Sequence, residues 1–515
     1  MKQIAVRNRR EWRRLPNWRN FAEAKHSSIR TSLFAALAYI VLVFALLLPI
    51  GNLISADFIF DVNYNEGWSV YNVERLIRGE LIYDDNYWRV NNYPIGSFLI
   101  IAGLNLLIHD LLLSGRLVSL VSFVAVGVLA AILTRRFGGR RTDAVFGAAC
   151  AMGFCYLVAP AWIVADDPQT LGEAVMLGAL VSYSARPPDR FNLFRTAFIL
   201  VLAGFIKHNL VAIPIAITLD LAIRSPRRLL FWFACCAGFV AACLGLTQLV
   251  AGGNFFDHLL SPRIFSWYGA RYHLMKYLRL FKLPMVAIAL STPWVLTVDR
   301  IVIAGWGMVS ISSAAILSGF EGTSYNMFQD AAVFLGIAAG IMMSELRKLD
   351  TSGRLAGVLS TALPFVLAEP ILARAPDVAA QTYDSRALLA VDRKRQRLFL
   401  ADAEYVADRQ GPAICENLLL CYVAGRPFIL DPFNSRQYML SGKLDQGKLI
   451  RRINRHEFAL IQLHADICDD PATPSCHILH YRQKIDRFTD EVLYAINQYY
   501  EVGRRSDFGT FYVPK

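Results

Sequence analysis

Long apolar runs separated by short polar loops fill residues 32–370, whereas residues 371–515 have the mixed pattern of a water-soluble protein. A helix that crosses a bilayer needs roughly 17–25 mostly apolar residues, and the runs reach or approach that length. The pattern predicts about eleven transmembrane helices: Ser32–Ile54, Leu117–Thr134, Ala144–Ala165, Leu171–Ser184, Leu193–Phe205, Leu210–Ile223, Leu229–Ala251, Pro284–Val298, Ile301–Phe320, Met327–Met343 and Leu355–Ala368.

One apolar run, Pro94–Ile108, has only fifteen residues and is ambiguous. If it crosses the membrane, every later loop changes side. If it lies along the membrane interface, the basic loops RRFGGRR, SARPPDR, RSPRR and RKLDTSGR all fall on the side of the basic N-terminus. Cytoplasmic loops carry the excess of Lys and Arg. We therefore expect a juxtamembrane helix here, a cytoplasmic N-terminus and a C-terminus outside.

The C-terminal part predicts a small α/β domain. GPAICEN and FALIQLH have the pattern of buried strands, Glu491–Glu501 that of a helix, and GTFYVPK that of a closing strand. The expected organisation is a basic cytoplasmic segment 1–31, a membrane domain 32–370 with a large outer loop 55–116, and a periplasmic domain 371–515.

Composition agrees with a membrane protein, since 55% of residues are apolar, 18% are charged and the mean hydropathy is +0.37. The net charge of +12 lies in the N-terminus and the short loops, which argues against a nucleic-acid partner. The first apolar run has no cleavage site with small residues, so we expect a retained helix and not a signal peptide.

The first outer loop is the most informative polar stretch. It holds acids among many Asn, Tyr and Trp residues: Asp57, Asp61, Glu66, Asp84 and Asp85. Loops this long are usually functional or disordered, and this aromatic content argues against disorder. Acidic and amide side chains beside Trp and Tyr suit the binding of a sugar. The alternative is a solvated loop whose scattered acids have no function.

Three motifs in this region, NYNEGWSVYNVERLIRGELIY, NNYPIGSFLI and LLLSGRLVSL, resemble the opening of the C-type (GT-C) glycosyltransferase superfamily. The resemblance is to the group of protein O-mannosyltransferases and lipid A aminoarabinose transferases, and continues through ADDPQTLGEA, GFIKHNLVAIP and GTSYNMFQDAAVF. It implies a polyprenyl-phosphate sugar donor, inversion at the anomeric carbon, and an acceptor reached from the outer face. A carboxylate would activate the acceptor and cations would hold the leaving phosphate.

The acidic pair of the superfamily matches Asn65 and Glu66, so its usually catalytic first acid is replaced by Asn. We therefore expect Glu66 to be the catalytic carboxylate, with Asp61 as the alternative. A carboxylate near Gly67 also suits the first turn of a helix, where it would stabilise the helix without taking part in chemistry.

The second outer acid of the superfamily matches Asp167, with Asp166 beside it, although two acids there may equally mark the membrane interface. Lys207 is the candidate cation for binding the donor phosphate. The alternative is that its side chain only extends to the membrane–water interface. Arg271 and His273 are further candidates, on a loop with Arg263, Lys276 and Arg279 that also suits an amphipathic segment on the bilayer. Tyr325 and Asn326 are expected to contact substrate.

The sequence contains no common metal, nucleotide or dinucleotide motif. The resemblance allows a divalent metal, but no residue pattern fixes one. Of the nine cysteines, the four in the outer domain predict disulfides, and three pairings are possible. We favour Cys468 with Cys476 across a turn-rich loop, which leaves Cys415 to pair with Cys421 if the chain bends between them. Zinc binding is a weaker alternative.

Together these features predict a glycosyltransferase of a bacterial inner membrane that uses a polyprenyl-phosphate sugar and a glycan, lipid or protein acceptor. A flippase or transporter of lipid-linked glycans is the alternative, as is a membrane protein that binds glycan or lipid without catalysis. A flippase should place charges deep in its spans, whereas most charges here lie at helix ends.

Overall fold

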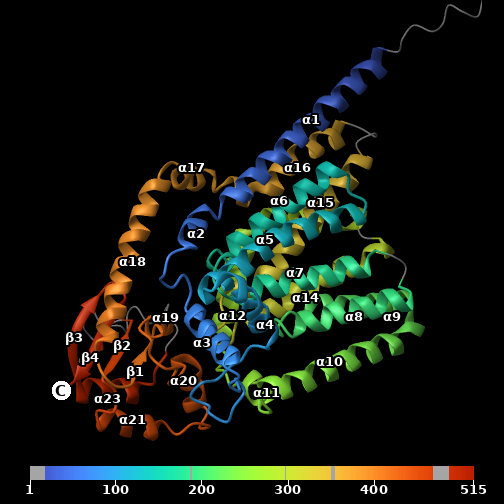
Figure 1. The fold of residues 1–515 in the computed structure, drawn as a ribbon. Coiled ribbons are helices and arrows are strands. Elements are labelled where there is room, and N and C mark those ends of the chain that lie inside the picture. The colour runs from blue at the N-terminus through green and yellow to red at the C-terminus, as the bar shows by residue number, and fades with distance from the viewer. Residues whose placement is uncertain (1–17, 186–187, 296, 350–353, 465, 468–486) are drawn as a thin grey trace, which may run out of the picture.

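The computed structural model describes residues 18–185, 188–295, 297–349, 354–464, 466–467 and 487–515, and Figure 1 shows the helices packed beside a smaller C-terminal region. Each predicted span coincides with a helix. These helices are α1 (Trp18–Leu47), α5 (Leu111–Arg136), α6 (Arg141–Val158), α7 (Pro168–Tyr183), α8 (Arg190–Gly204), α9 (Ala212–Arg224), α10 (Leu229–Ala251), α13 (Lys282–Val295), α14 (Ile301–Leu317), α15 (Gln329–Leu349) and α16 (Arg354–Leu372).

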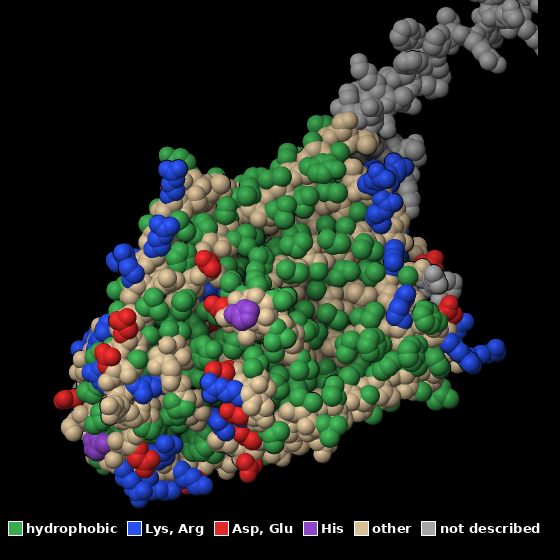
Figure 2. Space-filling view, in the orientation of Figure 1, with side chains coloured by type: hydrophobic (Ala, Val, Ile, Leu, Met, Phe, Trp, Pro, Cys, Tyr) green, Lys and Arg blue, Asp and Glu red, His purple; other side chains and the backbone are tan. Residues whose placement is uncertain are grey.

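Four helical stretches of the described chain are both long and apolar enough to cross a membrane: Arg30–Ser55, Leu111–Arg136, Pro226–Ala251 and Tyr325–Arg347. Other apolar helices are shorter, including Ile301–Leu317. The chain is therefore a multi-pass membrane protein, and the number of crossings stays a prediction. Figure 2 shows the broad apolar surface of the bundle, with Lys and Arg side chains gathered along its right-hand edge.

The segments that connect the helices lie at two opposite ends of the bundle (Figure 1). At one end Arg347 pairs with Asp143, and Arg300 donates to the carbonyl of Phe137, 2.8 Å away, and pairs with Glu345. The short helices η2 (Pro226–Arg228) and η3 (Val298–Arg300) lie between spans at this end. The other end carries α2 (Ile50–Ser55), α3 (Asn65–Ile77), η1 (Ala161–Ile163), α11 (Phe255–Leu259), α12 (Trp267–Leu280) and η4 (Tyr325–Phe328).

The ambiguous run forms α4 (Gly96–Ile108), a helix of 13 residues. At 1.5 Å per residue it is about 20 Å long, short of a hydrocarbon core of about 30 Å. His109 ends it with a left-handed φ of 59°, and Asp110 then caps α5 by accepting from the backbone N–H of Leu113 at 2.9 Å. Leu106 and Leu107 are 75% and 77% exposed, which suits a helix that lies against lipid.

The C-terminal region contains the predicted α/β elements. Its four-stranded sheet has the order β1-β2-β4-β3, where β1 (Ala413–Cys415) runs parallel to β2 (Leu460–Leu463). Strand β4 (Gly509–Pro514) is antiparallel to β2 and to β3 (Tyr500–Ser506). The surrounding helices are α17 (Ala375–Tyr383), α18 (Ser385–Ala407), α19 (Leu418–Val423), α20 (Pro432–Leu440), α21 (Gln446–Asn454) and α23 (Asp490–Tyr499). Strand β3, which continues directly from α23, was not predicted.

This region is not separate from the first outer loop, because the two share a hydrophobic core. Phe60 and Val70 pack in one cluster with Phe399 and Leu419. Helices α3 and α19 approach so closely at Gly67 that a Cβ there would lie 2.1 Å from the backbone nitrogen of Leu419. The glycine after the Asn-Glu pair therefore lets the C-terminal region dock against the start of α3.

Candidate functional site

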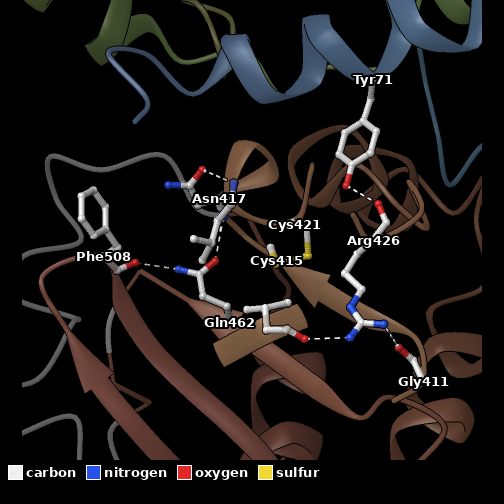
Figure 3. Close-up of a disulfide and its surroundings, with 10 residues drawn as sticks. Tyr71, Gly411, Cys415, Asn417, Cys421, Arg426, Gln462 and Phe508 are labelled. Carbon is white, nitrogen blue, oxygen red and sulfur yellow. Dashed lines mark hydrogen bonds between the residues drawn. A yellow bond between two sulfur atoms is a disulfide. The ribbon is translucent and has the colours of Figure 1, made fainter. Parts of the chain in front are cut away.

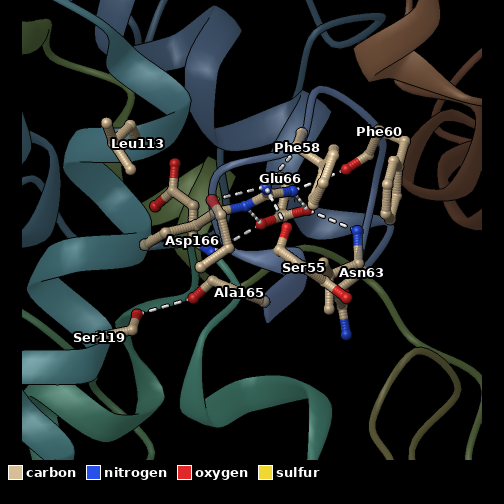
Figure 4. Close-up of polar contacts among 12 residues, drawn as sticks. Ser55, Phe58, Phe60, Asn63, Glu66, Leu113, Ser119, Ala165 and Asp166 are labelled. Atoms are coloured by element: carbon tan, nitrogen blue, oxygen red, sulfur yellow. Dashed lines mark hydrogen bonds and ion pairs between the residues drawn. The ribbon is translucent and has the colours of Figure 1, made fainter. Parts of the chain in front are cut away.

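Glu66, in the first turn of α3, forms a buried ion pair with Arg116 of α5. Arg116 Nε lies 2.7 Å from one carboxylate oxygen and Nη2 lies 2.8 Å from the other (Figure 4). The backbone N–H groups of Val62 and Asp166 donate to the same two oxygens at 2.7 and 3.2 Å. Both Glu66 and Arg116 are at most 1% exposed. This geometry favours a structural role for Glu66 over that of an acceptor-activating base.

Arg116 also holds the chain that leads into α3. Its guanidinium donates to the backbone carbonyls of Ala56, Phe58 and Phe60 at 3.0, 2.7 and 2.7 Å. A guanidinium has five N–H donors in a fixed planar arrangement, so one side chain can satisfy several acceptors at once. The Arg116–Glu66 pair therefore fixes the loop of residues 55–66 to the outer end of α5.

Asp166 and Asp167, adjacent in sequence, have different surroundings. The carboxyl of Asp166 is buried against Gly115, where a Cβ would lie 2.1 Å from its Cγ. Burial raises the pKa of Asp166 well above its usual value. Asp166 therefore packs inside the protein, and only its backbone N–H reaches Glu66.

Asp167 contacts two other predicted site residues, Asn65 and Lys207. Asn65 Nδ2 donates to Asp167 Oδ2 at 2.7 Å, and Lys207 Nζ lies 3.6 Å from Oδ1. Oδ1 also accepts from the backbone N–H of Gln169 at 2.8 Å, which caps the start of α7. The ammonium of Lys207 lies 3.8 Å from the ring centroid of Tyr93, whose hydroxyl donates to Asp167 at 3.4 Å. The structure thus brings Asn65, Asp167 and Lys207 into direct contact.

The electrostatics of this cluster follow from burial and from the paired charges. Burial is the largest influence on the pKa of Lys207 and lowers it, but the charge of Asp167 and the contact with Tyr93 together raise it by more, so the ammonium stays protonated. Burial and the charge of Asp167 raise the pKa of Tyr93, which stays neutral. The side chains of Asp167 and Lys207 are 0% and 2% exposed, so they lie beneath the partly exposed Asn65 and Tyr93.

His208 and Arg263 are further basic side chains beside the cluster. Burial of the His208 ring, followed by the charges of Lys207 and Arg263, lowers its pKa to about 4, so His208 stays neutral next to these cations. Arg263 is held there by the carbonyl of Glu321, which accepts at 2.8 Å, and by the ring of Phe433.

Asp61, the alternative carboxylate, faces the C-terminal region. Asn417 Nδ2 donates to Asp61 Oδ1 at 2.8 Å and is its one hydrogen-bond partner in the described part of the chain. Asp61 is partly exposed, and burial raises its pKa above the usual value. A carboxyl with solvent access and raised basicity has the properties that a general base needs.

Tyr64, three residues beyond Asp61, connects the start of α3 to the C-terminal region. Its hydroxyl donates to Asp431 Oδ1 at 3.1 Å, and the guanidinium of Arg487 lies 3.5 Å from its ring centroid. Burial raises the pKa of Asp431, which also caps α20. Residues 61–66 therefore contact both the outer end of the bundle and the C-terminal region.

The remaining predicted substrate contacts form a second group around α12. Arg271 lines an exposed cavity of about 590 Å³ on this helix, whereas His273 faces α14 and its Nδ1 hydrogen-bonds to the carbonyl of Ser318 at 3.0 Å. Tyr325 is buried beneath Lys276, whose Nζ lies 4.5 Å from the ring centroid. Asn326 accepts a hydrogen bond from Ser324 at 2.9 Å. Within the described residues, no hydrogen bond or ion pair joins this group to the Asp167 cluster.

The predicted bond between Cys415 and Cys421 is present, with a Cα–Cα distance of 5.7 Å (Figure 3). The required bend exists because β1 ends at Cys415 and Asn417 caps α19, with its side chain accepting from the N–H of Leu420 at 3.3 Å. Cys468 and Cys476 lie outside the described residues. The cysteines of the spans are unpaired thiols.

The described residues do not fit the divalent metal that the resemblance allows. Nowhere in the described ranges do three or more His, Cys, Asp or Glu side chains come together as metal ligands. We therefore derive no step through a metal ion.

Sequence reasoning missed the contacts of Tyr93 and Asp431 and the role of Arg116. Arg116 carried a readable signal, since a charge within an apolar run usually has a buried partner. Tyr93 and Asp431 carried none, because their partners lie 74 and 367 residues away along the chain.

No protein-family model matches the sequence, and no curated protein matches it. Solved structures do resemble it. ArnT from Cupriavidus metallidurans bound to undecaprenyl phosphate gives a TM-score of 0.55 at 13% identity, over 94% of this chain and 97% of ArnT. The oligosaccharyltransferase of Archaeoglobus fulgidus tethered to an acceptor peptide gives 0.51 at 12% identity, over 94% of this chain and 74% of that protein. The chain therefore has the fold of the GT-C membrane glycosyltransferases.

Proposed function

We propose that this protein is a membrane glycosyltransferase that moves a sugar from a polyprenyl-phosphate donor to an acceptor at the outer face of a bacterial inner membrane. The observation that carries the proposal is the polar cluster at the start of α3. There a carboxylate of raised pKa, Asp61, shares one short segment with Asn65, which contacts the Asp167–Lys207 pair. The resemblance in fold to ArnT bound to undecaprenyl phosphate supports this choice of donor.

Two neighbouring features suit a lipid-linked donor. Helix α12 presents Arg271, Lys276 and Arg279 beside exposed aromatic side chains, as expected for a surface that holds a phosphate at the membrane interface. Helix α13 begins two residues after α12 ends. An apolar cavity of about 430 Å³ lies between α13, α14 and α15, lined by residues such as Ile288, Met308 and Phe334. An isoprenoid chain in this cavity would place its phosphate towards α12.

The proposed chemistry assigns a role to the carboxylate and to the cations of this region. The acceptor hydroxyl gives its proton to the carboxylate of Asp61, and its oxygen attacks the anomeric carbon of the donor sugar. The bond from that carbon to the phosphate oxygen breaks with inversion, and its electron pair leaves on the phosphate. Arg263, which is partly exposed, supplies positive charge where this negative charge develops, and the buried ammonium of Lys207 adds to it from beneath.

Asp167 is then a positioning residue. It orients Lys207 and Asn65 and, being fully buried, does not itself reach a substrate. Glu66 holds the loop through Arg116, so we place Asp61 before Glu66 as the acceptor-activating carboxylate.

The test is transfer by the purified full chain in lipid nanodiscs, with a panel of polyprenyl-phosphate sugars and an envelope lipid extract as acceptor. We expect release of polyprenyl phosphate together with a product of inverted anomeric configuration from at least one donor. Release without glycosylated product would indicate hydrolysis, and no release from any donor would contradict the proposal.

A further inference from the structure

A second cavity, of about 410 Å³, lies between the first outer loop and the C-terminal region and is used by none of the chemistry above. Its volume falls in the usual range for sites that bind small molecules. One wall is formed by Asn86, Trp88 and Arg89. The opposite wall is formed by residues 428–430 and by Lys448, Leu449 and Arg452 of α21.

The lining of this cavity is cationic. It contains three basic side chains and no acid. Arg452 pairs with Glu457 at 2.8 Å and Arg89 pairs with Asp84 at 2.9 Å, while the Nε of Arg89 is buried without a hydrogen-bond partner in the described part of the chain. Lys448 is exposed and takes part in no ion pair that the described residues form. The cavity therefore keeps one cation, Lys448, that no carboxylate of the described residues neutralises.

Trp88 provides an aromatic surface beside these cations. Its carbonyl accepts from the backbone N–H of Asp431 at 2.7 Å and from the hydroxyl of Ser435 at 3.1 Å, which fixes its position. The ring is partly buried and packs against the core that contains Leu449. An indole face suits the apolar face of a sugar ring, and Asn86 adds both a donor and an acceptor for hydroxyl groups.

The cavity is linked to the segment of residues 61–66 through one residue. The backbone of Asp431 binds Trp88, while its side chain binds the hydroxyl of Tyr64 near the start of α3. A ligand in the cavity would therefore lie against residues that hold Tyr64, three residues after Asp61, in place.

From this combination we infer that the cavity binds an anionic sugar residue, bearing a carboxylate or a phosphate, and that it anchors the acceptor glycan. The claim that the cavity anchors the acceptor glycan rests on the proposed function, whereas the claim that it binds an anionic sugar does not.

Binding can be measured on the full chain in nanodiscs, without any lipid donor, by calorimetry with three probes. The probes are an oligosaccharide of glucuronate, its neutral glucose counterpart, and glucose 6-phosphate. We expect the neutral probe to bind at least about tenfold more weakly than an anionic one, as loss of one charge-assisted contact would produce. The other two probes distinguish a carboxylate ligand from a phosphate ligand.

Lys448→Gln should weaken anionic binding about tenfold and leave neutral binding unchanged. Arg455→Gln is the matched control, because Arg455 is exposed just beyond the same helix and does not line the cavity. Equal binding of neutral and anionic probes, unchanged binding in Lys448→Gln, or no binding of any probe would overturn the inference. Asp61→Asn should bind the probes as the unmodified chain does, so a failure of catalysis and a failure of this site are distinguishable.

Discussion

Asn65 donates a hydrogen bond of 2.7 Å to Asp167, at the position where the resembled superfamily has its first acid. A carboxylate at position 65 would therefore lie against a second carboxylate, with Lys207 as their shared cation. The amide keeps the contact and removes the repulsion. This explains how the fold accommodates Asn in place of an acid at position 65. The acceptor-activating base must then be another residue.

Asn65→Asp should make stability depend on pH. Two carboxylates in contact raise the pKa of one of them, so the folded state holds a proton that the unfolded state has lost. The variant should be closest to normal at about pH 5 and lose thermal stability as the pH rises through the raised pKa. Melting curves at about pH 5 and 8 test this, with Asn65→Ala as the uncharged control. An equal loss of Tm at both pH values in the two variants would contradict it.

Glu66→Gln should act mainly on folding. It leaves Arg116 buried without its counter-charge, a change that typically costs about 3–5 kcal/mol. We expect a clear fall in the Tm of the detergent-solubilised protein, and a rate per folded molecule that falls much less than in Asp61→Asn. Normal stability with abolished transfer would return Glu66 to the catalytic role.

The disulfide between Cys415 and Cys421 should appear as a linked peptide in non-reduced digests, and so should the pair Cys468–Cys476, which remains a prediction. The first bond closes a short loop in a packed core, so its loss should cost about 2 kcal/mol in the chain-entropy estimate and should not abolish folding. Free thiols at Cys415 and Cys421 would count against the outer location of this region. Free thiols at both Cys468 and Cys476 would refute the second bond.

Reporter fusions test the orientation that the loop charges predict. Fusions after Arg141 and Arg228 should be cytoplasmic, and fusions after Asn254 and at the C-terminus periplasmic. The reason is that the basic loops share one end of the bundle when α4 lies along the membrane interface. A cytoplasmic C-terminus would require α4 to span.

The apolar runs predicted the helices and their grouping well, because in a membrane the backbone must satisfy its own hydrogen bonds. The sheet of the C-terminal region was only partly predicted. The helical pattern of Glu491–Glu501 overlaps the start of β3, and pairing with β4 decides where the helix ends.

The candidate site was predicted in part. The sequence identified Asn65, Asp167 and Lys207, and the structure places them in contact. It ranked Glu66 above Asp61 because Glu66 matches the acidic pair of the resembled superfamily, and the sequence does not show the partners of either carboxylate. Arg116 and Asn417, which distinguish these two carboxylates, lie 50 and 356 residues away in the chain. Such pairings arise only from the fold.

The most direct test of the central claim compares single-turnover transfer by Asp61→Asn and by Asp57→Asn in nanodiscs. Asp57 is an exposed acid of the same loop, so it controls for the loss of one charge. With a donor that the unmodified chain uses, Asp61→Asn should lower the rate by about 10²–10⁴-fold while keeping donor binding and Tm, as removal of a general base does. Asp57→Asn should keep the rate. Equal rates in the two variants would contradict the assignment of Asp61 as the acceptor-activating carboxylate.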